Sequence, residues 1–251
     1  MSSTRYISVA LLFVVVLFSS CKESCRYAVV VSANAEWASL KKVYPAEKIL
    51  RSPWGEYFTR KTAGMDVLFF HEGWGKVSAA GATQYVIDRF NPDILINIGT
   101  CGGFEGGVER FETILADKTV IYDIIEAMGD SKEAIADYTT KIDLSWLGEN
   151  YPVKVKKTLL VSADRDLRQD ELALLKKEYS AVAGDWETGA IAYVAVKNRK
   201  KILILRGVTD IVSTEKAEAY GNIDLFAQRT DSVMSKLLGE LPLWIGFIEK
   251  K

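Results

Sequence analysis

Two acidic side chains between residues 184 and 210 carry the strongest chemical signal in this chain. Glu187 lies where an extended segment, residues 181–185, gives way to a predicted helix, and Asp210 lies just past an apolar strand, residues 202–205. Ligands of open α/β sheets bind beyond the carboxyl ends of the strands. Carboxylates at that edge could bind a substrate and transfer a proton. The structural alternative makes Glu187 a helix first-turn acid and Asp210 a turn residue.

The composition narrows the classes of function. The 251 residues are 49% apolar, enough for the core of one α/β domain or two small ones. The net charge of -1 gives no sign of a nucleic-acid surface. A single histidine and three cysteines exclude most metal sites and His-based nucleophilic mechanisms. We therefore expect no metal, no organic cofactor and no nucleic-acid partner.

The N-terminus has the pattern of an export signal. Arg5 precedes an apolar run, residues 7–18, that is too short to span a bilayer comfortably, and Ser19, Ser20 and Cys21 follow it. The pattern resembles a bacterial lipoprotein signal over residues 1–20, with Cys21 as the lipidated residue. An uncleaved anchor and a misassigned start codon are the alternatives. The expectation is an exported lipoprotein, anchored to a membrane in the periplasm or at the cell surface.

Predicted strands alternate with predicted helices over residues 26–251, which we expect to form one domain. The alternation predicts an α/β fold, a three-layer sandwich with a central mixed, largely parallel sheet. Right-handed crossovers would bring the strand ends to a common rim. Polar or glycine residues follow several of these strands, namely Ser32, the loop at 73–75, Gly99, Thr100, Ser162, Thr209 and Asp210. Glycine at such positions lets backbone N–H groups approach a ligand closely.

Five short motifs follow one another along the chain: GKVSAA at 75–80, GTCGG at 99–103, LLVSAD at 159–164, DWETGAIA at 185–192 and RGVTD at 206–210. Together they resemble the nucleoside phosphorylase and nucleosidase superfamily. The branch to which the chain is most similar is the 5′-methylthioadenosine/S-adenosylhomocysteine nucleosidases. The resemblance runs from about Tyr27 to the last predicted helix. It implies a nucleoside phosphorylase-like fold, a small nucleoside substrate, no cofactor and a homodimer.

The resemblance also implies roles for individual residues. Asp210 matches the acid that protonates the purine at N7, which makes the base a better leaving group. Glu187 matches the carboxylate that holds the ribose hydroxyls and stabilises the cationic sugar. The other candidate substrate-binding residues are Thr209 beside the acid, Trp186 against the ribose, Thr100 and Gly102 beneath the sugar and the nucleophile, Asp166 and Leu167 along the base, and Ser162 at a strand end.

Three departures from the family pattern bear on the reaction. Asn97 stands where phosphorylases place a phosphate-binding arginine, which favours hydrolysis over phosphorolysis. Trp37 stands where nucleosidases place the glutamate that activates water, with Glu36 one position earlier. Either Glu36 takes that catalytic role or water activation is impaired, since one residue turns a helix face by about 100°. Asp166 replaces an aromatic residue beside the base, which argues against simple transfer of adenine specificity.

The sequence therefore predicts a nucleosidase, an N-ribohydrolase that cleaves the N-glycosidic bond of a purine nucleoside such as 5′-methylthioadenosine or S-adenosylhomocysteine. Its catalytic residues would be Asp210 and Glu36. Two alternatives stay open at this point. One is a phosphorylase that uses phosphate, and the other is a non-catalytic nucleoside-binding or adhesion lipoprotein on the same fold.

Overall fold

The structure is a computed structural model that describes residues 24–251. The predicted export signal and the predicted lipidation site Cys21 lie outside the described residues. Within the described part, no helix combines the length and the apolar character needed to cross a membrane.

The strands follow the apolar runs of the sequence. The segment YAVVV, for example, is buried along its whole length, as expected for a strand covered on both faces. The ten strands of the described chain are β1 (Tyr27–Val31), β2 (Leu50–Arg51), β3 (Glu56–Thr62), β4 (Met65–His71), β5 (Ile94–Phe104), β6 (Thr113–Ile121), β7 (Thr139–Lys141), β8 (Lys156–Ser162), β9 (Ala183–Asp185) and β10 (Lys201–Val212).

These strands form one mixed sheet in the order β10-β6-β8-β9-β5-β1-β4-β3-β2, with β7 beside β6. An additional β10–β5 pairing closes part of the sheet into a barrel-like ring. The α/β class and the mixed sheet are thus confirmed, but the sheet is not a simple open layer. Parallel pairings join β1 to β4 and β5, β10 to β5, and β8 to β6 and β9. The antiparallel pairings are β2–β3, β3–β4, β6–β7, β6–β10 and β5–β9.

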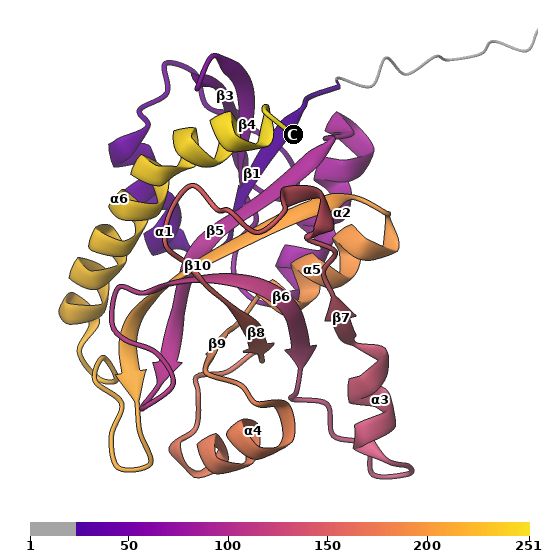
Figure 1. The fold of residues 1–251 in the computed structure, drawn as a ribbon, viewed down its shortest axis with the longest axis vertical. Coiled ribbons are helices and arrows are strands. Elements are labelled where there is room, and N and C mark those ends of the chain that lie inside the picture. The colour runs from indigo at the N-terminus through magenta and orange to yellow at the C-terminus, as the bar shows by residue number, and fades with distance from the viewer. Residues whose placement is uncertain (1–23) are drawn as a thin grey trace, which may run out of the picture.

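Four of the helices pack in two pairs on opposite sides of β5 and β10 (Figure 1). Helix α1 packs against α6 in one pair, and α2 packs against α5 in the other. The helices are α1 (Asn34–Val43), α2 (Lys76–Phe90), α3 (Ser131–Asp137), α4 (Leu172–Tyr179), α5 (Thr188–Lys197) and α6 (Ile223–Ile248), with short 3₁₀ turns η1 (Ser145–Leu147) and η2 (Gln169–Glu171).

Strands β5 and β10 extend further than the sequence predicted. Gly99 and Thr100 were predicted to follow a strand, yet the whole GTCGG motif lies inside β5, and Asp210 lies inside β10 instead of just past a strand. The two strands pair in parallel as far as Phe104 and Val212, so each supplies the hydrogen bonds that keep the other extended. The register shifts between Val208 and Asp210. Such a bulge re-aims the side chains that follow it.

Strands β1, β4, β5 and β10 run parallel, so their carboxyl ends point toward the same end of the molecule, and β5 and β10 continue past the ends of β1 and β4. In Figure 1 this end is at the bottom, where the arrowheads of β5 and β10 lie, and the described chain begins at the opposite end. Strand β8 runs antiparallel to β5 and β10, and its last residue, Ser162, pairs with Asp185 of β9. The candidate site residues are therefore brought to one rim by the topology.

Candidate active site

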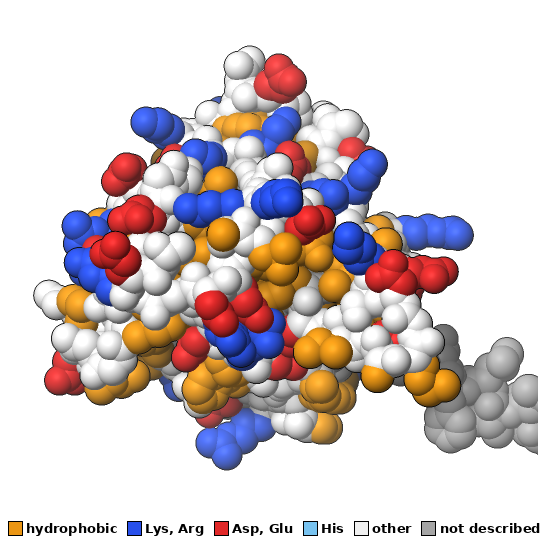
Figure 2. Space-filling view, turned by 90° about the horizontal axis from the view of Figure 1, so that it is seen from below, with side chains coloured by type: hydrophobic (Ala, Val, Ile, Leu, Met, Phe, Trp, Pro, Cys, Tyr) orange, Lys and Arg blue, Asp and Glu red, His pale blue; other side chains and the backbone are white. Residues whose placement is uncertain are grey.

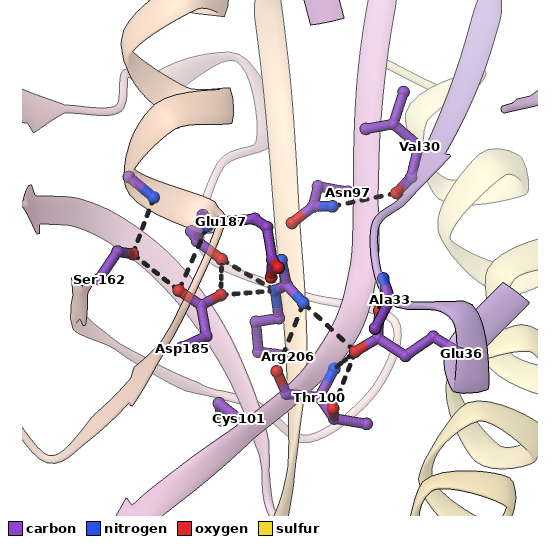
Figure 3. A network of polar contacts seen from close by, with 12 residues as sticks. Val30, Ala33, Glu36, Asn97, Thr100, Cys101, Ser162, Asp185, Glu187 and Arg206 are labelled. Carbon is purple, nitrogen blue, oxygen red and sulfur yellow. Dashed lines mark hydrogen bonds and ion pairs between the residues drawn. The ribbon is translucent and has the colours of Figure 1, made fainter. Parts of the chain in front are cut away.

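A single buried arginine organises the polar residues at this rim (Figure 3). Arg206 of β10 is fully buried, and its Nε lies 3.0 Å from Oδ2 of Asp185 and donates to Thr188 Oγ1 at 2.9 Å. Its Nη1 donates to the carbonyl of Thr100 at 3.3 Å and lies 3.5 Å from Oε1 of Glu36. The guanidinium thus holds one carboxylate from β9 and one from α1 on either side of β5.

Glu36, and not Trp37, points into the site. Its Oε1 accepts hydrogen bonds from the backbone N–H of Thr100 at 2.6 Å and from its hydroxyl at 2.8 Å, and Oε2 accepts from Ala33 N–H at 3.3 Å. Trp37 turns away, donates to Glu56 and stacks on His71. Consecutive helix positions face different directions, so the shift of one residue places a glutamate beside Thr100.

Glu187 precedes α5 and faces the same buried cluster. Its Oε1 accepts a hydrogen bond from the backbone N–H of Gly75, at 3.0 Å, in the loop that starts α2. Burial raises the pKa of Glu187 to about 8; Arg206 opposes this shift, and the like charges of Asp185 and Glu36 add to it. A carboxyl group with such a pKa, at the edge of a ligand site, can exchange a proton near neutral pH.

Asp210 lies across the rim, supported by its neighbour. The Thr209 hydroxyl donates to Oδ1 of Asp210 at 2.7 Å and also approaches the carbonyl of Cys101 at 3.3 Å. Burial raises the pKa of Asp210, although the Thr209 hydrogen bond and the charge of Arg229 lower it. Asp210 is therefore biased toward the protonated form that a general acid needs.

Asp166 and Leu167 line an open cavity of about 670 Å³ beside Asp210, together with residues of η2 and Tyr220. Leu167 is buried and Asp166 is exposed. The Tyr220 hydroxyl donates to the carbonyl of Leu167 at 2.9 Å. A cavity of this size falls within the usual range for small-molecule sites.

The remaining predicted site residues have structural contacts. Trp186 packs against the exposed Trp74 with ring centroids 5.4 Å apart, and Gly102 pairs with Gly184 of β9. Ser162 is fully buried, donates to Asp185 at 2.7 Å and accepts from the N–H of Gly189 at 2.9 Å. The Ser162 hydroxyl therefore positions Asp185 and the start of α5.

Arg206 and Asp185 lie in the RGVTD and DWETGAIA motifs, but no role was predicted for either residue. A lone arginine inside the apolar run of β10 was the available signal, because a charge inside a strand must find a buried partner. The partner could not be identified, since Asp185 lies 21 positions earlier and reaches Arg206 only through the sheet topology.

We expect Glu36→Gln to lower kcat by about 10- to 100-fold, because the amide keeps the shape but cannot accept a proton from water. The matched control is Trp37→Phe, which alters the neighbouring position but keeps an aromatic ring against His71. Its kcat should stay within about threefold of the parent value, since Trp37 faces away from Thr100. Equal losses in the two variants, measured by release of free base, would contradict the assignment of Glu36.

We expect the folded state to lose stability as the pH rises from about 5 to 9. Burial raises the pKa values of Glu72 and Glu187 to about 8, so the native state binds more protons than the unfolded state above the ordinary glutamate range. The stabilisation of the folded state by protonated Glu72 and Glu187 is fully present at pH values below the ordinary glutamate pKa. It is lost as the pH rises through about 8. Thermal midpoints of the parent should fall over this interval more steeply than those of Glu72→Gln/Glu187→Gln. If the thermal midpoints of the parent and of the double variant fall equally with pH, the pKa values of Glu72 and Glu187 are not raised.

The surface around the rim carries charged side chains of both signs. Figure 2 shows this end of the molecule, with Asp and Glu side chains interspersed with Lys and Arg and with hydrophobic patches. A mixed surface of this kind fits a small-molecule site better than a polyanion-binding face.

Comparison with known proteins gives the family. The family model described as the phosphorylase superfamily matches residues 26–241. A 5′-methylthioadenosine/S-adenosylhomocysteine nucleosidase of Buchnera aphidicola is 26% identical over 230 residues, covering 86% of this chain and 98% of that protein. The Thermotoga maritima protein of the same name is 31% identical over 166 residues, covering 65% and 75% of the two chains.

Solved structures share the fold at low sequence identity. A Streptococcus pneumoniae nucleosidase with 8-aminoadenine has a TM-score of 0.70 at 19% identity, covering 88% of this chain and 98% of that one. A Helicobacter pylori nucleosidase mutant with 5′-methylthioadenosine in its active site has a TM-score of 0.71 at 13% identity, covering 91% and 100%. The chain belongs to the phosphorylase superfamily, on the branch of the 5′-methylthioadenosine/S-adenosylhomocysteine nucleosidases.

Proposed function

We propose that the protein is a nucleosidase that hydrolyses the N-glycosidic bond of a purine nucleoside such as 5′-methylthioadenosine or S-adenosylhomocysteine. The names of its relatives and the arrangement of Asp210, Glu187 and Glu36 around one rim support this activity. We also propose that the domain is a three-layer sandwich, with helices on both sides of the sheet.

Each of the three carboxyl groups has a distinct chemical task. Asp210 donates its proton to the base, so the C1′–N9 bond breaks with its electron pair on a neutral leaving group. The sugar becomes cationic, and Glu187, which the positive charge favours in its ionised form, stabilises it and holds the ribose hydroxyls. Water bonds to C1′ and gives its proton to Glu36, which Thr100 holds in place.

Hydrolysis, not phosphorolysis, is favoured because the protein's own carboxylates already occupy the anion-binding groups of the rim. Asp185 and Glu36 lie on either side of the Arg206 guanidinium. Glu187 accepts from Gly75 N–H, and Asp164 accepts from Lys76 N–H at the start of α2. A phosphate ion there would lose these donors and face like charges.

Asn97 does not replace the missing phosphate ligand. Its Nδ2 donates to the carbonyl of Val30 at 3.0 Å, inside the sheet. The side chain is fully buried between β5 and β1 and points away from Thr100 (Figure 3). This contact leaves the amide nitrogen engaged with the backbone, and water remains the nucleophile that the site suits.

The deciding experiment measures release of free base from 5′-methylthioadenosine, S-adenosylhomocysteine, adenosine and inosine, with and without phosphate. We expect release without phosphate, and no more than about a twofold change when phosphate is added. Release that depends on phosphate would make the protein a phosphorylase. A folded protein that binds these nucleosides without releasing base would be a binding protein.

The cellular setting is a further part of the proposal and rests on the N-terminal sequence. We infer export and lipidation at Cys21, which places the domain at a membrane surface in the periplasm or outside the cell. Mass spectrometry of the mature protein would detect the lipid on Cys21, and its absence would end this proposal.

We also propose that the protein forms a homodimer, as the family resemblance implies. Trp74 is 65% exposed and Val77 is 81% exposed beside the loop that contacts Glu187, an apolar surface that a second subunit would cover. Sedimentation equilibrium that gives the monomer mass at assay concentrations would oppose it.

A further inference from the structure

Glu72 is a buried carboxyl group beside the site, and none of the steps above uses it. It follows β4 directly, and its N–H donates to the carbonyl of Val31 at 2.8 Å, so it stands beside the end of β1. Its side chain is fully buried, and Oε1 accepts from the hydroxyl of Thr83 in α2 at 2.6 Å. Oε2 is buried as well and has no hydrogen-bond partner among residues 24–251.

The charged groups that face Glu72 belong to the cluster around Arg206. The guanidinium lies on the β10 side and Glu187 on the α5 side, and the polar Thr83 and Ser32 face it from α2 and from the end of β1. Arg206 makes its ion pairs with other carboxylates, so no cation of the described chain is within ion-pair distance of Glu72. A buried carboxylate that faces only hydroxyl groups and has no counter-ion is strongly disfavoured.

The neutral form of Glu72 satisfies these surroundings better. Burial raises its pKa to about 8, with the charge of Glu187 adding to the shift and Thr83 and Arg206 opposing it. Since the Thr83 hydroxyl donates to Oε1, that oxygen is the carbonyl oxygen of the acid. The proton then resides on Oε2, the atom without a partner.

A short loop links Glu72 to Glu187. The carbonyl of Glu72 accepts from the Ser78 hydroxyl at 2.6 Å, which ties the residue to the first turn of α2. Three positions after Glu72, the N–H of Gly75 donates to Oε1 of Glu187. A change in the charge or position of Glu72 is therefore transmitted to Glu187 both through the loop and directly through space.

We propose that Glu72 is a positioning residue for Glu187, a neutral carboxylic acid whose Oε2–H faces Ser32 and the carboxyl cluster around Arg206. It limits the negative charge beside Glu187 and keeps that carboxyl group oriented for the sugar. The inference rests on the proposed function for the role of Glu187. The protonation of Glu72 can be measured without any substrate, so the two ideas can fail separately.

The first test is a carbon-13 NMR titration of the protein labelled at the glutamate carboxyl carbons. Glu72→Gln and Glu187→Gln assign the two resonances. We expect the Glu72 signal to have the shift of a protonated acid at pH 6.5 and to titrate above pH 7. A Glu72 signal that titrates near the ordinary glutamate value would overturn the proposal. If Glu72→Gln does not fold, the parent protein still decides the question. A parent spectrum in which only one glutamate resonance, that of Glu187, titrates above pH 7 would also overturn the proposal.

The second test compares two neutral replacements in the full-length protein. Glu72→Gln keeps an N–H donor at the Oε2 position and should retain at least a third of the parental kcat. Glu72→Leu removes the donor and should lower kcat by about 10- to 100-fold with a smaller change in KM, because Glu187 acts most strongly on the cationic sugar. Equal losses in two folded variants would overturn the positioning role, even if the nucleosidase activity itself is established.

Discussion

Asp210→Asn is expected to lower kcat for base release by about 10²- to 10⁴-fold, with KM changed far less. Asparagine keeps the acceptor for the Thr209 hydroxyl but has no acidic proton to give the base. Because burial raises the pKa of Asp210, the parental kcat should fall as the pH rises through that pKa, and the variant should lose this dependence. Stopped assays of free base over pH 5–9 measure both effects.

The matched control for this prediction is Asp137→Asn, the same change on an exposed residue at the end of α3. Its kcat should stay within about twofold of the parent, and its thermal midpoint within a few degrees, because surface changes cost about 0.5 kcal/mol or less. A folded Asp210→Asn variant that keeps more than about a tenth of the parental kcat would show that another group protonates the base.

Arg206→Leu is expected to cost roughly 3–5 kcal/mol of folding free energy, because it leaves Asp185 and Glu36 as buried charges without their cation. For a domain of this size, that loss lowers the thermal midpoint by roughly 6–20 °C. Calorimetry and urea unfolding measure it. Activity should fall as well, since both carboxylates would move or take up protons.

The control for Arg206 is Arg51→Leu, which breaks an ion pair at the surface. The Arg51 side chain is 82% exposed and lies 3.4 Å from Glu56, so its removal should cost only about 0–1 kcal/mol. Neutralising the partners with Asp185→Asn and Glu36→Gln in the Arg206→Leu background should recover part of the lost stability. If Arg206→Leu and Arg51→Leu shift the midpoint equally, the buried cluster does not have the energetic importance given to it here.

The sequence predicted most of the elements because their apolar runs are local signals. Strand β1 lies within one residue of the apolar run at 27–32, and helix α2 within one residue of the amphipathic pattern at 77–90. The order of the motifs identified the family. The prediction that Gly99 and Thr100 follow a strand was wrong, since the parallel partner β10 keeps residues 99–103 extended. The short strand β7 was missed for a similar reason: its three residues are stabilised by pairing with β6 and have little strand signal of their own.

The residue types at the rim were also fixed by the sequence: an acid with its supporting hydroxyl, a second glutamate and a glycine loop. Which of Glu36 and Trp37 enters the site was decided only by the tertiary structure, because the choice depends on how α1 is rotated against β5. The same is true of the carboxylates gathered around Arg206, which come from α1, β9 and the loops before α2 and α5. Local patterns specify strands and helices, whereas the contacts of a buried charge depend on elements that meet only when the sheet closes.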